Sequence, residues 1–275
     1  MTQTPDNSLR LAIAGLGAIG MTVARCVDSG GITGMSVAAV SARDVEKAKK
    51  RVADFSSPPE ILPLEKLGDV ADIVIESVPA SNFEKVARPA LEKGRMFMPL
   101  SVGAMLNHMD LVDLAREKGG RIIVPTGALI GLDAVRAAAS GGLKTVKLTT
   151  RKPPGGLMDA PYVVENRIDL EGLNEAKLLF SGSAREAAKG FPANLNVGVA
   201  LALAGLGPDK TTVEIWADPA VNRNIQSVDV TSDCADFSMS IRNVPSEENP
   251  RTGRITAHSV IAALKRLTEP LVVGS

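Results

Sequence analysis

Short apolar runs and longer amphipathic stretches alternate through the first part of the chain. The apolar runs cover residues 9–14, 71–78, 95–101 and 120–125, and they are apolar at consecutive positions, as strands buried on both faces of a parallel sheet are. Residues 81–94 and 104–120 have the spacing of crossover helices. This order predicts an α/β domain with a parallel sheet over residues 1–125.

The pattern changes after Pro125. Apolar and polar positions alternate, as in half-exposed strands, within residues 143–154, 211–218, 225–232 and 235–243. Residues 182–207 look helical with a break at Phe191-Pro192, and residues 249–267 have the pattern of an amphipathic helix. We therefore expect a second, α+β domain with a largely antiparallel sheet over residues 126–250. The C-terminal helix, within residues 251–275, should pack back on the first domain.

Charge and cysteine content narrow the function classes. The 31 basic and 31 acidic residues give a net charge of +0, which argues against nucleic acid or an anionic membrane as the main partner. Cys26 and Cys234 lie far apart without metal-ligand spacing, so we expect free thiols and no metal site. No apolar run reaches about 18 residues, and residues 1–10 lack a signal pattern. These features favour a cytoplasmic protein.

A glycine turn follows the first predicted strand. Gly15, Gly17 and Gly20 have the dinucleotide-binding spacing, between a strand and a helix as that motif requires. The first glycine permits the tight turn, the second lets a pyrophosphate approach the backbone, and the third allows close packing of helix on strand. With Ala18 and Ile19 between them, these residues form the predicted phosphate-binding part of a nucleotide site.

The end of the second strand bears on the choice of cofactor. The strand within residues 35–44 should end near Ser41, where an acid would hold the ribose 2′-hydroxyl of NAD. Ser41 and Arg43 occupy this region, and a hydroxyl with a guanidinium suits a 2′-phosphate. We expect NADP to be accepted alongside NAD; the alternative is that Arg43 is a solvated residue that opens the next helix.

Small and polar residues follow the remaining strands of the first domain. They are expected around the cofactor, because ligands of such sheets bind beyond the carboxyl ends of the strands. These segments are Ser77-Val78-Pro79, Ser101-Val102-Gly103 and Thr126-Gly127-Ala128.

Longer blocks give a more specific indication. The chain contains "GLGAIG", "SVGAM", "PTGALIGLDA", "TTRKPP", "LFSGSAREAAKGFPANLNV", "ADPAVNRN" and "NPRTGRITAHSVIAAL". In this order and spacing they resemble the L-aspartate dehydrogenase family over nearly the whole chain. The resemblance implies a Rossmann domain followed by an α+β domain that binds substrate and pairs into homodimers. It also implies NAD(P)-dependent interconversion of L-aspartate with iminosuccinate, which hydrolyses to oxaloacetate and ammonia.

The resemblance also transfers individual roles. Ala128 and Asn194 match cofactor contacts of the family, and Thr126 stands where serine is usual. The family's Asn-x-His pattern, which carries the catalytic acid/base, corresponds here to Asn224-Ile225-Gln226. Gln226 can donate a hydrogen bond to a carboxylate, but it cannot shuttle a proton.

The missing acid/base leaves the proton chemistry open. Only two histidines exist, His108 in a predicted first-domain helix and His258 in the terminal helix, and neither matches the catalytic position. Loss of a general acid/base costs about 10²–10⁴ in rate. Lys152, or a water held by Asn224, is the alternative proton carrier.

An acidic substrate also needs cations near the site. The candidates are Arg151, Lys152, Arg185 and Arg223. Two other functions remain open: an oxidoreductase or imine reductase on a related amino acid or carbonyl compound, and an NAD(P)-binding protein without catalysis.

Overall fold

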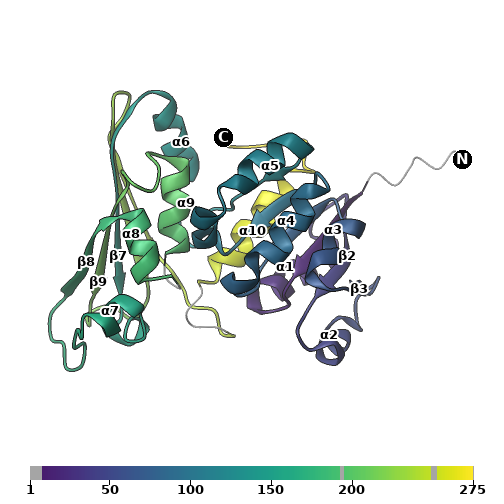
Figure 1. Ribbon diagram of the computed structural model, residues 1–275, viewed down its shortest axis with the longest axis horizontal. Helices are drawn as coiled ribbons and strands as arrows, with labels where there is room; N and C mark the ends of the chain where they lie inside the picture. Colours follow the sequence, from purple (N-terminus) through teal and green to yellow (C-terminus); the bar gives the residue numbers. More distant parts are fainter. Residues whose placement is uncertain (1–7, 193–194, 249–252, 275) are drawn as a thin grey trace, which may run out of the picture. The chain divides into compact units, whose positions relative to one another are not determined.

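The computed structural model describes residues 8–192, 195–248 and 253–274. The chain divides into two compact units (Figure 1). The first unit comprises Met1–Pro125 and Ala257–Val272, and the second comprises Thr126–Thr256 and Val273–Ser275. Each unit has its own sheet and its own hydrophobic core.

The first unit is built on a parallel sheet with strand order β3-β2-β1-β4-β5-β6. The strands are β1 (Leu9–Ala14), β2 (Met35–Ser41), β3 (Glu60–Ile61), β4 (Ile73–Glu76), β5 (Met96–Pro99) and β6 (Arg121–Ile122). The helices are α1 (Ala18–Asp28), α2 (Val45–Val52), α3 (Leu67–Val70), α4 (Phe83–Glu92), α5 (Asp110–Lys118) and α10 (Ile255–Lys265), with 3₁₀ turns η1 (Leu64–Lys66), η2 (Ala80–Asn82) and η3 (Val102–Asn107).

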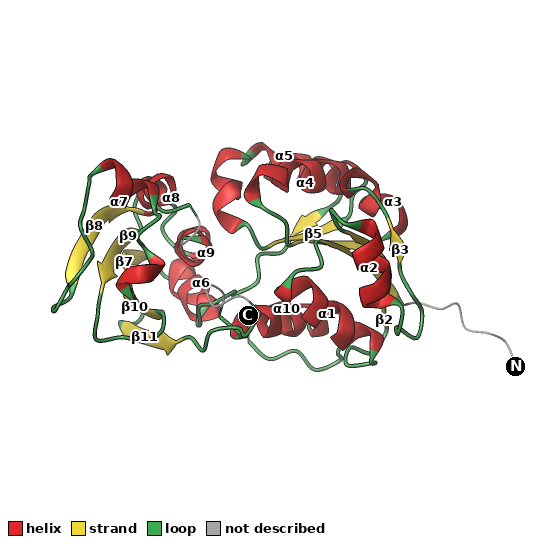
Figure 2. Ribbon diagram, turned by 90° about the horizontal axis from the view of Figure 1, so that it is seen from below, coloured by secondary structure: helices red, strands yellow, loops and turns green. Residues whose placement is uncertain are grey.

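Helices cover both faces of this sheet. Helices α1 and α10 lie on one face, and α4 and α5 lie on the other (Figure 2). The strands are apolar at consecutive positions because both of their faces are covered. Val260 and Leu264 of α10 are fully buried in the same cluster as Ile13 and Ile73 of the strands. The C-terminal helix is therefore an integral part of the first unit.

The second unit is built on a mixed sheet with strand order β11-β10-β7-β9-β8. The strands are β7 (Leu143–Lys152), β8 (Lys177–Ser183), β9 (Thr212–Ala217), β10 (Ile225–Ser232) and β11 (Phe237–Arg242). The helices are α6 (Leu132–Ser140), α7 (Pro161–Glu165), α8 (Ala184–Gly190) and α9 (Asn196–Ala204), with a 3₁₀ turn η4 (Pro154–Gly156). The pair β7–β9 is parallel and the other three pairs are antiparallel, so the predicted fold class is confirmed.

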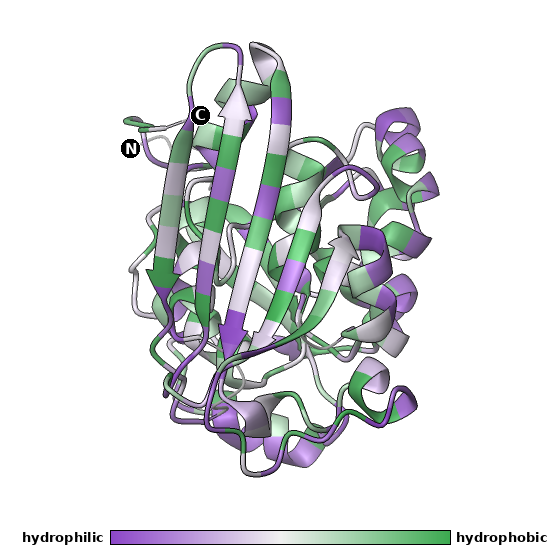
Figure 3. Ribbon diagram, turned by 90° about the vertical axis from the view of Figure 1, so that its left-hand side faces the viewer, coloured by the Kyte–Doolittle hydropathy of each residue, from purple (hydrophilic) through white to green (hydrophobic). Residues whose placement is uncertain are grey.

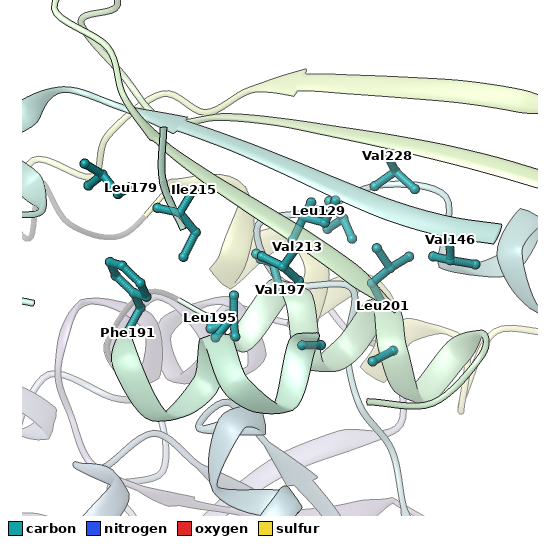
Figure 4. Close-up of a cluster of buried hydrophobic side chains, with 14 of the residues drawn as sticks. Leu129, Val146, Leu179, Phe191, Leu195, Val197, Leu201, Val213, Ile215 and Val228 are labelled. Carbon is teal, nitrogen blue, oxygen red and sulfur yellow. The ribbon is translucent and has the colours of Figure 1, made fainter. Parts of the chain in front are cut away.

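The two faces of the second sheet differ. Side chains on one face, such as Val146, Val213 and Val228, pack against Leu201 and the other apolar residues of α9 (Figure 4). The opposite face is mixed in hydropathy, and none of the helices described in this unit covers it (Figure 3). This difference explains the alternating pattern of these strands.

Strand β8 and the helices α6 and α7 were not expected from the sequence. The predicted helical stretch began at Gly182, but residues up to Ser183 belong to β8 and helix α8 begins at Ala184. The boundary is set by a capping box. The Ser183 hydroxyl accepts a hydrogen bond from the backbone N–H of Glu186, and the Glu186 carboxylate accepts one from the backbone N–H of Ser183. The sequence SAREA has this signature, so the start of the helix could have been recognised.

Candidate functional site

The glycine turn joins β1 to α1 and requires its glycines for two different reasons. Gly15 has φ of +95°, and a Cβ atom there would lie 2.6 Å from the backbone oxygen of Ser77. A Cβ on Gly20 would lie 2.0 Å from the backbone oxygen of Gly15. A Cβ on Gly17, in contrast, would have no heavy atom within 4 Å. The turn therefore keeps an open space beside Gly17, which a phosphate group can approach.

A pocket of about 720 Å³ opens at this turn and extends to the ends of β2 and β4. Its volume suits a small-molecule ligand. The lining residues are Gly15, Leu16, Gly17, Ser41, Ala42, Arg43, Asp44, Lys47, Ala48, Arg51, Pro63, Leu64, Ser77, Val78, Pro79 and Asn82. Of the predicted cofactor residues, the pocket brings together Gly15, Gly17, Ser41, Arg43 and Ser77. Ala18, Ile19 and Gly20 form the start of α1 instead.

Two cations of the pocket were missed in the sequence. Lys47 and Arg51 lie one turn apart on α2 and join Arg43 in the lining. The Arg51 guanidinium donates a hydrogen bond to the backbone oxygen of Leu16, within the glycine turn. Asp44 also lines the pocket, and its side chain caps α2 by accepting from the backbone N–H of Lys47 at 3.0 Å. The i, i+4 spacing of Lys47 and Arg51 was the available signal.

The lining therefore has an excess of positive charge at the end of β2. The lining contains three cationic side chains and one carboxylate. This chemistry fits a phosphorylated ligand, and the open glycine turn fits a pyrophosphate. Two independent features of the first unit, the cationic lining and the open glycine turn, therefore fit a dinucleotide cofactor.

Glu76, the last residue of β4, is a buried carboxylate that was also missed. It is 0% exposed, and it accepts hydrogen bonds from the backbone N–H groups of Val78 (3.0 Å), Leu100 (3.3 Å) and Ser101 (2.9 Å). The Ser101 hydroxyl lies 3.0 Å from the same carboxylate. Burial raises the pKa of Glu76 above its ordinary value, while these hydrogen bonds act in the opposite direction.

In the second unit, three polar residues lie on one face of the sheet: the predicted site residues Gln226 and Lys152, and their neighbour Thr150. Gln226 of β10 pairs with Thr150 of β7, and Lys152 lies two residues further along β7. Side chains at i and i+2 of a strand point to the same face, so all three are on the helix-covered face, where they are buried. The Thr150 hydroxyl donates a hydrogen bond to the side-chain oxygen of Gln226.

Lys152 has the electrostatic properties of a proton carrier. Its side chain is 5% exposed, and burial lowers its pKa from 10.5 to about 8. A group with this pKa exchanges protons near neutral pH, which a glutamine cannot do.

Asn224 and Ala128 lie at the same end of the second sheet. Asn224 immediately precedes β10, and its backbone oxygen accepts from the backbone N–H of Asn243 at 2.9 Å. The Asn243 side chain is buried and donates to the backbone oxygen of Ala128 at 3.0 Å. Asn243 therefore connects two segments that were singled out separately in the sequence. Asn194, the other predicted cofactor contact, lies outside the described residues.

The predicted anion-binding cations do not gather at this place. Arg151 alternates with Lys152 and points to the opposite face, where it pairs with Asp218 at 3.1 Å and stacks over Trp216 at 4.9 Å. Arg185 forms a two-point pair with Asp209. The Arg223 side chain donates to the Asn222 side-chain oxygen at 3.1 Å. Of the four candidates, Lys152 alone lies beside Gln226 on the buried face.

Both histidines belong to the first unit, whereas Gln226 belongs to the second. His108 ends η3, just before α5, and its ring lies 5.5 Å from that of Phe83. It was expected inside a helix; the break at residues 108–109 separates η3 from α5. His258 lies in α10 and is exposed.

No cluster of three potential metal ligands was found among the residues that the structure describes. None of the helices in the described ranges has the length and apolar character needed to cross a membrane.

Each of the two parts of the chain matches a model of a known protein family. Residues 133–267 match the model described as "Aspartate dehydrogenase, C-terminal". Residues 15–125 match the model described as "Homoserine dehydrogenase, NAD binding domain". The second match coincides with the glycine turn and the pocket, and it confirms the expected cofactor, NAD or NADP.

Individual proteins give the same assignment. The chain is 54% identical to an L-aspartate dehydrogenase of Bradyrhizobium diazoefficiens, with 99% of this chain and 96% of the relative covered. It is 49% identical to L-aspartate dehydrogenase 3 of Bordetella bronchiseptica, with 97% and 98% covered. The crystal structure of aspartate dehydrogenase from Thermotoga maritima has a similar fold, with a TM-score of 0.72, 22% identity, and 97% and 99% of the two chains covered.

Proposed function

The chain belongs to the L-aspartate dehydrogenase family, and from this premise we propose that it is an enzyme that interconverts L-aspartate and iminosuccinate with NAD or NADP. Iminosuccinate hydrolyses to oxaloacetate and ammonia, so the reverse direction is a reductive amination of oxaloacetate. The observation that carries the chemistry is the buried lysine, Lys152, on the same sheet face as Gln226 and Thr150.

The first unit supplies the cofactor site. The backbone beside Gly17 would hold the pyrophosphate, and Ser41 with Arg43, Lys47 and Arg51 would hold the adenosine ribose and its substituent. When bound, the nicotinamide ring supplies the hydride acceptor or donor. Ala128, Asn194 and Ser77 remain proposed cofactor contacts.

The second unit supplies the proton chemistry. The α-ammonium of aspartate must lose a proton before the Cα hydrogen can leave as hydride, because the nitrogen lone pair then forms the C=N bond. Neutral Lys152 would accept this proton, and its pKa of about 8 keeps an appreciable neutral fraction near neutral pH. The same group, once protonated, would return a proton in reductive amination.

Gln226 would orient the substrate instead of moving protons. Its side-chain oxygen accepts from Thr150, so its amide nitrogen is the group that can donate to a substrate carboxylate. Asn224, one strand position before β10, is the proposed partner for a second substrate oxygen or a water. Hydride transfer depends on such orientation.

An assay of NAD(P)H oxidation with oxaloacetate and ammonia tests this function. We expect turnover that falls by about 10²–10⁴ in Lys152→Met, the usual effect of losing a general acid/base. Lys147→Met is the matched control, because Lys147 is on the same strand but on the opposite face, paired with Glu214 at 2.7 Å. If Lys152→Met retains full turnover, Lys152 does not carry the proton.

A related imine or carbonyl substrate is the second candidate, and the observation that favours it is Gln226 itself. A neutral amide at this position favours reduction of an imine that is already formed, since that step needs orientation more than proton transfer. Turnover on preformed imines with none on oxaloacetate and ammonia would select it. Tight cofactor binding without any turnover would instead select a non-catalytic protein.

For the cofactor we infer acceptance of NADP at least equal to that of NAD. The support is the group of three cations at the end of β2, with Ser41 where an acid would select NAD.

For the assembly we infer a homodimer formed through the uncovered face of the second sheet. Thr149 and Ser227 lie on this face, opposite to the buried residues of their strands, and Ser240 of β11 pairs with Ser227 on the same face. Trp216 adds aromatic surface. Ser227→Arg at this face should give a monomer by light scattering at micromolar concentration. A monomer in the unmodified protein would contradict the inference. The two free cysteines support a cytoplasmic location.

A further inference from the structure

We propose that Glu76 is a positioning residue for the cofactor pocket: its carboxylate joins the segments that follow β4 and β5 and thereby fixes the pocket wall formed by Ser77, Val78 and Pro79. This inference rests on cofactor binding by the first unit. Glu76 is itself absent from the pocket lining, so it would act only through the backbone that it holds.

The position of the carboxylate is unusual for its surroundings. The other residues of β4 are the apolar Ile73, Val74 and Ile75. All of them are 0% exposed, and Glu76 is buried to the same extent. An isolated buried carboxylate is costly, and it persists only where donors replace the lost water. Here three backbone N–H groups and one hydroxyl provide that replacement.

The donors come from two separate segments. Val78 follows β4, whereas Leu100 and Ser101 follow β5, the neighbouring strand. The Ser101 hydroxyl also lies 3.1 Å from the backbone oxygen of Val78. The carboxylate therefore forms a polar link between the carboxyl ends of two parallel strands, the edge at which ligands of such sheets bind.

The link continues to the glycine turn through the next residue. The Ser77 hydroxyl lies 2.8 Å from the backbone oxygen of Ala14 and 2.9 Å from that of Gly15. The space between Ser77 and Gly15 is so small that a Cβ on Gly15 would meet the Ser77 backbone at 2.6 Å. A shift of the backbone at residues 76–78 would therefore move the pocket wall relative to the glycine turn, which is the segment that approaches the cofactor phosphates.

Replacement by glutamine tests the charge and acceptor pattern at constant size. One carboxylate oxygen accepts from two backbone N–H groups, and the other from one N–H and the Ser101 hydroxyl. A glutamine amide has one NH₂ group, so in either orientation it places a donor against at least one backbone N–H. The segments should then separate, although the volume of the side chain is kept.

The experiment measures the Kd of NADPH and of NADH by nicotinamide fluorescence, together with the thermal unfolding midpoint. Glu76→Gln should weaken both cofactors by 10-fold or more at temperatures well below its midpoint. The matched control is Val27→Ala, which truncates a buried residue near the end of α1 and so lowers stability, at a position outside the pocket lining and outside the segments that Glu76 joins. It should bind both cofactors within 2-fold of the unmodified protein.

The outcomes separate the possible failures. Unchanged cofactor affinity in Glu76→Gln, or a loss no greater than in Val27→Ala, would overturn the positioning role. If Glu76→Gln does not fold, Ser101→Ala carries the test, because it removes the hydroxyl contacts to Glu76 and Val78 and keeps the backbone N–H donors. We expect about 3-fold weaker binding, and unchanged binding would again overturn the inference. Failure of the unmodified protein to bind either cofactor would contradict the proposed function instead.

Discussion

Thr150 and Gln226 face each other across the antiparallel pair β7–β10, and the Thr150 hydroxyl donates a hydrogen bond to the Gln226 side-chain oxygen. Both side chains are buried, with Gln226 3% exposed. The glutamine is therefore held in one orientation by its neighbour. A residue held in this way can position a substrate carboxylate, but the proton must be carried by another group, for which Lys152 is proposed.

Histidine at position 226 should substitute for Lys152. In a Lys152→Met background, adding Gln226→His should recover aspartate oxidation by about 10²-fold, the usual contribution of a general base. The recovered activity should rise with a pKa near the ~6.5 of histidine, measured from the pH profile of kcat/KM. In the unmodified background the same substitution should gain less than about 10-fold, because a base is already present. No recovery in the double variant, with cofactor affinity intact, would place Gln226 away from the reacting atoms.

The pH profile of the unmodified protein should report Lys152. Aspartate oxidation requires the neutral amine, so kcat/KM should rise as pH increases through about 8 and then level off. Lys147→Met should leave this profile unchanged, since Lys147 is half-exposed and lies on the opposite face, paired with Glu214. Lys152→Arg keeps the positive charge but cannot lose its proton, so it should remain inactive up to pH 10. A profile without an inflection near 8 would argue against Lys152 as the base.

Burial of Lys152 should also make the free energy of unfolding depend on pH. The pKa is lowered in the folded protein, so between about pH 8 and 10.5 the unfolded chain binds the proton that the folded protein has lost. Stability should therefore rise with pH across this window, and the unfavourable contribution, roughly 3 kcal/mol by the change in pKa, is fully present below pH 8.

Lys152→Met tests this dependence. The variant should be more stable than the unmodified protein at pH 7, and the difference should shrink as pH rises from 8 to 10.5. Denaturant unfolding at several pH values measures it. A constant difference across this range would show that Lys152 keeps its ordinary pKa in the folded protein.

Much of the fold follows from local signals in the sequence. The glycine turn, the end of β2 at Ser41 and the alternating strands of the second sheet were all predicted, because periodicity and glycine spacing directly encode them. The grouping of Arg151 with Lys152 ignored the same periodicity, since adjacent residues of a strand point to opposite faces. That error could have been avoided without a structure.

Other features depend on contacts between distant segments. Glu76 ends an apolar strand, where an acid is ordinarily solvated; its burial is caused by donors from residues 100–101, which follow a different strand. The role of Asn243 depends likewise on Ala128, which lies 115 residues away. Lys47 and Arg51 line the pocket because of the way α2 packs, and this orientation is not fixed by the spacing of its charges alone.

The cations of the pocket give the last prediction. NADPH carries a 2′-phosphate that NADH lacks, so residues that contact this phosphate should affect NADPH alone. Arg43→Ala and Lys47→Ala should each weaken NADPH about 10-fold and leave NADH within 2-fold, as measured by fluorescence titration at fixed ionic strength. Arg51→Ala should weaken both cofactors, because Arg51 also holds the backbone of Leu16 in the glycine turn.

Lys49→Ala is the control for a general loss of positive charge. Lys49 lies on the same helix but not in the pocket lining, and it pairs with Glu46 at 2.7 Å. Its replacement lowers the net charge as much as that of Lys47, so an effect of long-range field alone would appear equally in both variants. A selective loss of NADPH in Arg43→Ala and Lys47→Ala, absent in Lys49→Ala, requires direct contact with the phosphate. Tenfold tighter binding of NADH than NADPH by the unmodified protein would instead show that these cations serve another part of the cofactor.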